Sequence, residues 1–527
     1  MQRWLWIGAV TLAMAACTAR NSASNAGSAN TTQHVLRVAS VADPRTLNPY
    51  LSETDASYDL ASLTYSYLIV ADDRGRLIGD LATVVPDVAN GGVSADGRTY
   101  VYRLRRNVRW HDGPAFSAAD VIASWKAIVN PANPVPDREG YDKVASIVAP
   151  DPSTLVVHLR ERYPPFVTRF FTPLQEGAKP VLAAHVLARN RDFAAGELAG
   201  SAIGTGPFRF ESWHRGEDVR FTRFDGYYRG RPGLDGVLVR FVGSAQTAAN
   251  LLATHEVDLL VEPQAALLAQ YRAMSGVSIS TVPWNAQMSL LFNCAKPGLR
   301  AVSLRRAIAD AIPYASILRA VLGGVAAPAR SFLAPTSIGY LALTPRRLDV
   351  EAARRELSRV PMGTKLSFSI ATLAGSTTFE RIALLMQSSL RKIGIDATIK
   401  SYTYDLLAAP SGPILGGTYD LSLFGSSLNW DPDEYDSLAC DRRYPHGANV
   451  VRFCDERFDS LERAGLQTDR TPDRAVIYRK ASTLLWSMLP YVPLTEGRRL
   501  VVRSKALRNY RPNPTGTPWW NAWQWEL

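Results

Sequence analysis

The 527-residue sequence lacks the short motifs that mark common hydrolases and metal sites. It has no GxSxG, HExxH or GxxxxGKS/T pattern, which counts against serine hydrolases, zinc proteases and P-loop enzymes. His255-Glu256 imitates the start of a zinc motif but has no second histidine. The seven histidines are dispersed and the four cysteines form no CxxC pair, so neither a bound metal nor a cofactor is predicted.

Long apolar runs are also scarce, and the one at residues 5–16 is too short to span a bilayer as a permanent helix. Arg3 precedes this run and Cys17 ends it, a pattern typical of an export signal. Met14-Ala15-Ala16-Cys17 resembles the lipobox of bacterial lipoproteins, with methionine where leucine is usual, which implies lipid attachment at Cys17. The alternative is cleavage after Ala13-Met14-Ala15 and release of the protein.

A basic stripe with interleaved aromatic residues is missing as well. The formal net charge is +11, but the 59 Lys and Arg are scattered among 48 Asp and Glu. A nucleic-acid partner is therefore not predicted, because such a partner requires clustered positive charge. The pattern favours a solvated basic surface, with attraction to anionic lipid or an acidic solute as a minor alternative.

The rest of the chain divides into a polar segment and a long body. Residues 18–33 are rich in Ser, Asn, Ala, Gly and Thr, a composition typical of a flexible tether. Residues 34–527 exceed the size at which a single core keeps growing, so at least two lobes are expected. Proline and glycine are spread through this body rather than gathered in one linker, which favours interleaved lobes.

The cysteines of the body indicate one disulfide. Thiols tend to pair outside the cytoplasm, and Cys440 and Cys454 are close enough in sequence to close a short loop. Cys294 lies in an apolar, strand-like run and is predicted to be a buried free thiol.

A strand, a helix and a second strand are predicted in the C-terminal half. Apolar residues alternate with polar ones at 366–370 and again at 395–399, and they recur at helical spacing over 382–393. Gly394 follows the predicted helix at the position where a C-terminal cap residue commonly adopts the left-handed backbone conformation. Short connections of this kind imply a parallel strand pair, with ligands at the carboxyl ends of its strands.

Several motifs run through residues 35–493 in a fixed order. The strongest is DGRTY at 96–100 with LRRNVRWHDG at 104–113, followed by a helix start at Ser117. Others are GTGPF at 204–208, YYRGRPGLD at 227–235, the stretch 302–324, KIGI at 392–395 and YDL at 419–421. Together they resemble the bacterial extracellular solute-binding proteins of family 5, which include oligopeptide-, dipeptide- and nickel-binding members.

The resemblance implies an α/β fold of the type II periplasmic-binding-protein class, a two-lobe Venus flytrap with an extra subdomain in the first lobe. The expected boundaries are a signal peptide at 1–17, the tether at 18–33, lobe I at 34–283 with the subdomain at about 67–203, lobe II at 284–490, and a return segment at 491–527. His111-Asp112 and the glycines at 204–206 are read as a turn and a strand entry rather than as catalytic or phosphate sites.

Two stretches correspond to ligand-contacting loops of peptide-binding relatives. In the first, Glu53, Thr54 and Asp55 are candidates to pair with an extended peptide backbone. In the second, at 425–435, relatives that bind a peptide amine place an aspartate where this chain has Leu428. The candidate ligand residues close to Leu428 are Asn429, Trp430, Asp431 and Asp433. Trp284 and Asn285, which lie elsewhere in the chain, are weaker candidates.

Alternatives remain for this second stretch. Asp431-Pro432-Asp433 is equally read as a turn, and Trp430 either as a stacking wall of the pocket or as a core residue near the hinge.

The predicted function is that of a non-enzymatic substrate-binding component of an ABC importer. It would be a membrane-anchored, extracytoplasmic monomer that delivers a short peptide to a permease. The alternatives are the same fold with an opine, a sugar or a metal chelate as ligand and, further away, an exported hydrolase.

Overall fold

The computed structural model describes residues 34–51, 55–174, 178–190 and 192–527. His34–Leu527 form one compact unit. Of the predicted site residues, Cys17, Glu53 and Thr54 therefore lie outside the described residues. Asp55 begins helix α1 (Asp55–Thr64), and only its backbone is described.

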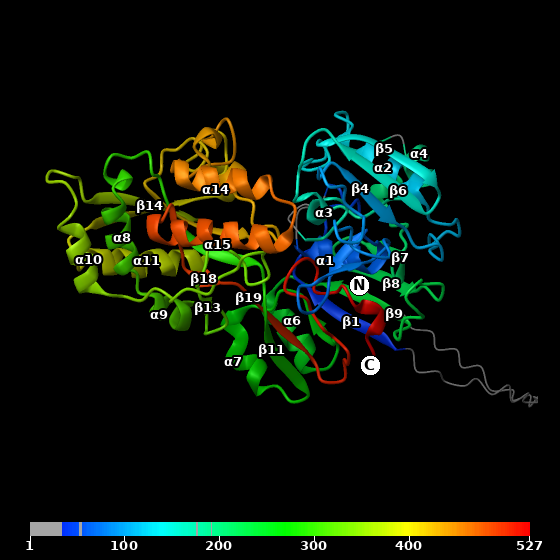
Figure 1. The fold of residues 1–527 in the computed structure, drawn as a ribbon. Helices are drawn as coiled ribbons and strands as arrows, with labels where there is room; N and C mark the ends of the chain where they lie inside the picture. Colours follow the sequence, from blue (N-terminus) through cyan, green and yellow to red (C-terminus); the bar gives the residue numbers. More distant parts are fainter. Residues whose placement is uncertain (1–33, 52–54, 175–177, 191) are drawn as a thin grey trace, which may run out of the picture. The chain divides into compact units, whose positions relative to one another are not determined.

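A seven-stranded sheet forms the part of the molecule that we call lobe I (Figure 1). The central strand β1 pairs in parallel with β9 and β10, and the outer strands add antiparallel pairs. In spatial order the strands are β11 (Val277–Pro283), β19 (Arg498–Ser504), β10 (Leu259–Leu260), β1 (Val35–Ser40), β9 (Gly236–Phe241), β8 (Asp218–Arg223) and β7 (Phe208–His214). Strand β19 follows the strands of lobe II in the sequence, so the chain returns to lobe I after it has passed through lobe II.

A smaller antiparallel sheet lies within the stretch expected for the extra subdomain. It contains β4 (Thr99–Arg103), β6 (Thr154–Leu159) and β5 (Val144–Asp151). Helix α2 (Ala118–Val129) follows the predicted helix start at Ser117, and a capping box joins Ser117 and Asp120. The core of this region is rich in fully buried aromatic side chains, including Trp110 and Tyr100.

A five-stranded sheet forms lobe II, in the order β15 (Asp396–Tyr402), β14 (Ser367–Leu373), β16 (Leu421–Ser427), β12 (Ala286–Phe292) and β17 (Tyr491–Pro493). The predicted strand, helix and strand are confirmed, because β14 and β15 are parallel and α11 (Thr377–Arg391) connects them. Gly394 adopts φ +81° after this helix. Strand β17 pairs with β12, so the lobe II sheet extends past the expected boundary at residue 490.

The remaining larger helices surround the two main sheets. Those of lobe I are α6 (Ala245–Ala253) and α7 (Leu268–Ala273). Those of lobe II are α8 (Val302–Asp310), α10 (Val350–Leu357), α14 (Glu456–Leu466) and α15 (Thr471–Met488). Among the helices that the structure describes, none combines the length and apolar character needed to cross a membrane.

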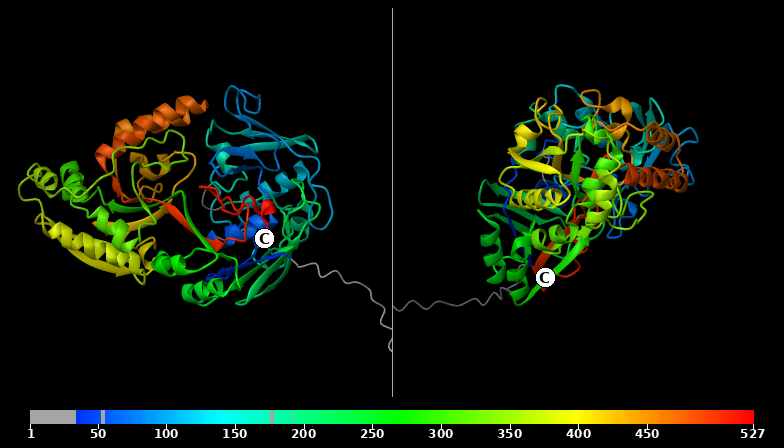
Figure 2. Two further views of the ribbon diagram at one scale, coloured as in Figure 1. Left: turned by 90° about the horizontal axis from the view of Figure 1, so that it is seen from below. Right: turned by 90° about the vertical axis from the view of Figure 1, so that its left-hand side faces the viewer.

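Two chain segments connect the lobes (Figure 2). One lies between β11 and β12, and the other lies between β18 (Thr495–Glu496) and β19. The Trp284 N–H of the first segment donates to the Gly497 carbonyl of the second at 3.0 Å. A Cβ at position 497 would lie 2.3 Å from the Ala286 carbonyl oxygen, so only glycine allows the two segments to approach this closely.

The cysteines of the body are placed in lobe II. Cys440 and Cys454 are joined in a disulfide with a Cα–Cα distance of 4.4 Å. Cys294 is a buried free thiol whose pKa is raised to about 11 by burial.

Candidate functional site

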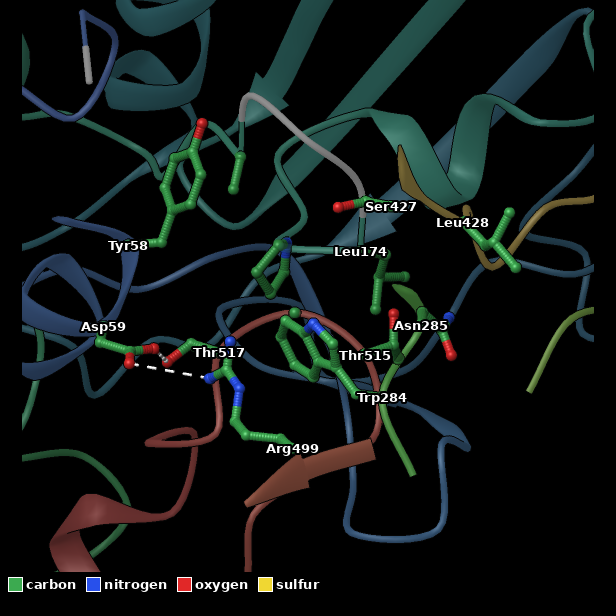
Figure 3. A pocket seen from close by; sticks show the side chains of 13 residues that line it. Tyr58, Asp59, Leu174, Trp284, Asn285, Ser427, Leu428, Arg499, Thr515 and Thr517 are labelled. Atoms are coloured by element: carbon green, nitrogen blue, oxygen red, sulfur yellow. Dashed lines mark hydrogen bonds and ion pairs between the residues drawn. The ribbon is translucent and has the colours of Figure 1, made fainter. Parts of the chain in front are cut away.

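A pocket lies where the connecting segments meet both lobes, and we call it the crossing pocket (Figure 3). Lobe I contributes residues of α1, the residues Pro173, Leu174 and Ala178, and residues of the return segment, and lobe II contributes the end of β16. The lining residues are Tyr58, Asp59, Pro173, Leu174, Ala178, Trp284, Asn285, Ser427, Leu428, Arg499, Thr515, Gly516 and Thr517. The weaker sequence candidates Trp284 and Asn285 are thus in the pocket, together with Leu428.

Opposite charges face each other in this pocket. The Arg499 guanidinium lies 3.8 Å from an Asp59 carboxylate oxygen, and both side chains are largely buried. The Thr517 hydroxyl donates to Asp59 Oδ1 at 3.1 Å, so the return segment holds the carboxylate from the other side. The guanidinium carbon is 3.5 Å from the centroid of the Trp284 ring, which fixes it over an aromatic face. The pocket therefore offers one anionic and one cationic group.

Asn285 joins the connecting segment to lobe II and leaves a donor at the pocket. Its N–H donates to the Pro514 carbonyl at 3.0 Å, and its carbonyl accepts from the Leu428 N–H at 2.7 Å. Its Oδ1 accepts from the Thr336 hydroxyl at 2.9 Å. Its buried Nδ2 has no partner within the described chain. A buried amide donor is costly when unpaired, so a ligand acceptor is its natural partner.

The predicted residues of the second stretch are divided among different cavities. Leu428 lines both the crossing pocket and a neighbouring cavity of about 370 Å³ in lobe II, which we call the side pocket. Asn429 lines the side pocket only. Trp430 and Asp431 line a third cavity of about 530 Å³, the outer cavity, whose walls come from both lobes. Asp433 lines none of these three cavities.

Asp431 serves the framework of lobe II. Its two carboxylate oxygens accept from the Arg474 guanidinium at 2.6 and 2.8 Å, and both side chains are at most 3% exposed. Its Oδ1 also accepts from the Asp433 N–H at 3.2 Å, and Asp433 in turn accepts from the Tyr435 N–H at 3.1 Å. These contacts are those of a turn fixed to α15, and burial raises the pKa of Asp433 to about 6.

Trp430 forms a wall rather than a core contact. Its indole N–H donates to the Gly75 carbonyl of lobe I at 3.0 Å. Thr336 lines the outer cavity beside it, and the Thr336 hydroxyl is the one that Asn285 of the crossing pocket accepts from. Trp430 and Thr336 therefore stand between the two cavities.

The charged residues of the crossing pocket were not among the sequence candidates. Asp59 lies on α1 and Arg499 on β19, while Thr515 and Thr517 belong to the return segment. Thr517 is far from Asp59 in sequence but is hydrogen-bonded to it (Figure 3). No local signal could have found Asp59, because no motif surrounds it in the sequence.

No set of three or more His, Cys, Asp or Glu in the described part of the chain is arranged to hold a metal ion. The crossing pocket instead presents groups suited to binding an organic solute through hydrogen bonds, opposite charges and an aromatic wall.

Comparison with known proteins matches residues 83–441 to the family model described as bacterial extracellular solute-binding proteins, family 5. The di/tripeptide-binding protein 2 of Pseudomonas aeruginosa is 25% identical over 504 residues, which cover 90% of this chain and 93% of that protein.

Two solved structures share the fold. One is the periplasmic binding protein DppA of Helicobacter pylori in complex with the peptide STSA, with a TM-score of 0.75, 24% identity, and coverage of 94% of this chain and 98% of that one. The other is NikZ of Campylobacter jejuni in complex with Ni(L-His), with a TM-score of 0.75, 21% identity, and coverage of 94% and 100%. The mixed α/β fold and the family match agree with the resemblance of the sequence motifs. The chain belongs to the family 5 bacterial extracellular solute-binding proteins, non-enzymatic binding components of ABC transporters.

Proposed function

We propose that this protein captures short peptides between its two lobes, anchored at the crossing pocket, and delivers them to an ABC permease. The observation that carries the proposal is the pairing of one carboxylate, Asp59, with one guanidinium, Arg499, at the wall of the pocket. A peptide carries an ammonium and a carboxylate at its ends, and charge-assisted hydrogen bonds to these groups are among the stronger polar contacts.

The missing aspartate at position 428 has a candidate replacement. Leu428 presents no charge, but Asp59 places a carboxylate in the same pocket from the opposite lobe. The Asn285 Nδ2 donor and the β16 backbone up to Ser427 add the groups that an extended peptide backbone would use. A peptide held in this way would contact both lobes and so favour their closed arrangement.

A second candidate ligand class is a non-peptide solute that carries a carboxylate, such as an opine or a metal–amino acid chelate. Leu428 favours this ligand class, because a ligand without a free peptide amine needs no carboxylate at position 428. Arg499 would then bind the ligand carboxylate.

Native mass spectrometry and calorimetry of the purified protein test the proposal. We expect binding of di- and tripeptides, and weaker binding when the same peptides are acetylated at the amine. Binding of opines or nickel–histidine in preference to peptides would favour the second candidate. Failure of peptides, sugars, opines and chelates alike would overturn both.

We also propose that Cys17 carries a lipid that holds the protein at the membrane. The support is the apolar run that ends at this cysteine. Replacement of Cys17 by Ser is expected to move the protein from the membrane fraction to the soluble fraction. Unchanged membrane association of the Cys17→Ser protein would contradict the anchor.

A further inference from the structure

The side pocket is a second chamber that adjoins the crossing pocket. Ser427 and Leu428 line both, so the end of β16 is their common wall. The crossing pocket measures only about 50 Å³, whereas the side pocket measures about 370 Å³. Pockets for small organic ligands span roughly 300–1,000 Å³. A ligand anchored at the crossing pocket therefore has room for a side group in the side pocket.

The side pocket combines a set of apolar walls with several uncharged polar residues and one charged residue. Its walls include Leu291, Ile414, Phe424, Leu438 and Val450. Among the residues that line it in the described chain, the single charged side chain is that of Glu434. The chamber thus combines walls that suit an aliphatic chain with one carboxyl group.

The carboxyl of Glu434 is held in place by neighbours on lobe II. Its backbone N–H donates to Glu462 Oε2 at 3.0 Å, and its side chain is hydrogen-bonded to Ser437. Burial, with the charge of Asp433 added, raises the pKa of Glu434 to about 7. The environment therefore disfavours the ionised form unless a positive charge is supplied.

Among the ion pairs of the described residues, none joins Glu434 to a lysine or arginine. The positive charge that acts on it is that of Arg169, at the end of α3 (Phe166–Arg169) in lobe I. Arg169 already forms an ion pair with Glu139 at 2.5 Å. A cation brought by the ligand is the remaining source of counter-charge from the pocket side.

Resting on the proposed peptide-binding function, we propose that the side pocket receives a basic side chain of the ligand, with its ammonium or guanidinium on Glu434. The aliphatic stem of a lysine or arginine packs along the apolar walls while the charged end reaches the carboxylate. A purely apolar side chain would fill the same walls but bring no counter-charge to the carboxyl, so it would lack the charge-assisted contact. The specificity thus lies in Glu434.

Calorimetric titration with matched peptides tests this inference. The probes are tri-alanine with one residue replaced by lysine at each position in turn, and the same peptides with norleucine, which has a similar stem and no charge. At one position the wild type is expected to bind the lysine peptide about tenfold more tightly than its norleucine partner, the effect typical of a charge-assisted hydrogen bond. Glu434→Gln is expected to abolish this preference by weakening binding of the lysine peptide.

The outcomes separate the inference from the proposed function. Equal wild-type affinity for lysine and norleucine peptides at every position would overturn the basic-side-chain inference and leave peptide binding intact. A preference that survives in Glu434→Gln would also overturn it. Absence of binding to any of the peptides would overturn the proposed function itself. The wild-type comparison needs no variant, and the Asp59→Asn protein serves as the control that weakens both peptides of a pair equally.

Discussion

Two aspartate–arginine pairs in this protein use the same chemical groups in different ways. Asp431 and Arg474 meet in lobe II through two hydrogen bonds of 2.6 and 2.8 Å, with both side chains at most 3% exposed. Asp59 and Arg499 are 3.8 Å apart at the wall of the crossing pocket. The first pair satisfies both partners internally, as a framework contact must when it is dry. The second pair lines a cavity, as the proposed binding site requires.

The comparison teaches that residue type alone does not separate scaffold from site. Asp431 is a candidate ligand residue by its place in the chain, yet its oxygens are directed to Arg474 and to the Asp433 N–H. Asp59 has no motif around it, yet it lines the pocket. The geometry of the partner decides the role in each case.

The largest expected effect breaks the buried pair. Asp431→Ala leaves the Arg474 guanidinium buried without its partner and is expected to lower the free energy of unfolding by about 3–5 kcal/mol. Urea denaturation followed by circular dichroism measures this change. The double variant Asp431→Leu with Arg474→Met removes both charges and is expected to recover most of the loss. A loss below about 1 kcal/mol in the single variant would contradict the framework role.

The pocket pair is expected to affect binding more than folding. Asp59→Asn keeps the shape and an acceptor for Thr517 but removes the negative charge, and peptide affinity is expected to fall about tenfold or more. Calorimetric titration measures the affinity, and urea denaturation provides the comparison with Asp431→Ala. An unchanged affinity, or a loss of stability as large as that of Asp431→Ala, would mean that the two pairs do not differ as proposed.

A third experiment addresses Glu434, a carboxyl that is buried like Asp431 and lines a pocket like Asp59. The pKa of Glu434 is raised from 4.5 to about 7, mainly by burial, so the folded protein holds this proton more tightly than the unfolded chain. Stability from this group is therefore present at low pH and is lost as the pH rises from about 4.5 through 7. The free energy of unfolding of the wild type is expected to fall more steeply over this range than that of Glu434→Gln. Urea titrations at several pH values measure the difference, and parallel curves would contradict it.

The smallest expected effect comes from a pair on the surface of lobe I. Lys143 and Glu161 approach to 2.6 Å, but the side chains are 33% and 61% exposed. Lys143→Met is expected to lower the free energy of unfolding by less than about 1 kcal/mol, since water and salt screen such pairs. Urea denaturation at low and high salt is the measurement. If Lys143→Met lowered the free energy of unfolding as much as Asp431→Ala, burial could not explain why ion pairs contribute differently to stability.

Much of the fold was predictable because its signals are local. The alternation at 366–370 and 395–399, the helical spacing between them and Gly394 are readable over a few residues, and the β14, α11 and β15 unit follows them. The capping box at Ser117 is likewise a matter of neighbouring residues. The pairing of β17 with β12 was not predictable in this way, because it depends on a strand far earlier in the chain.

The site was predictable only in part, for the same reason. The stretch at 425–435 does reach the crossing pocket and the side pocket through Leu428 and Asn429. The pocket's charges come from α1 and β19, which meet only because the return segment completes the lobe I sheet.

By itself, the sequence determined the α/β class, the family and the local elements, because periodicity, caps and motifs act between residues close in the chain. Only the tertiary structure decided which carboxylate belongs to the framework and which to the pocket. That distinction depends on the distance and burial of a partner from another element, and no stretch of sequence around Asp431 or Asp59 carries this information.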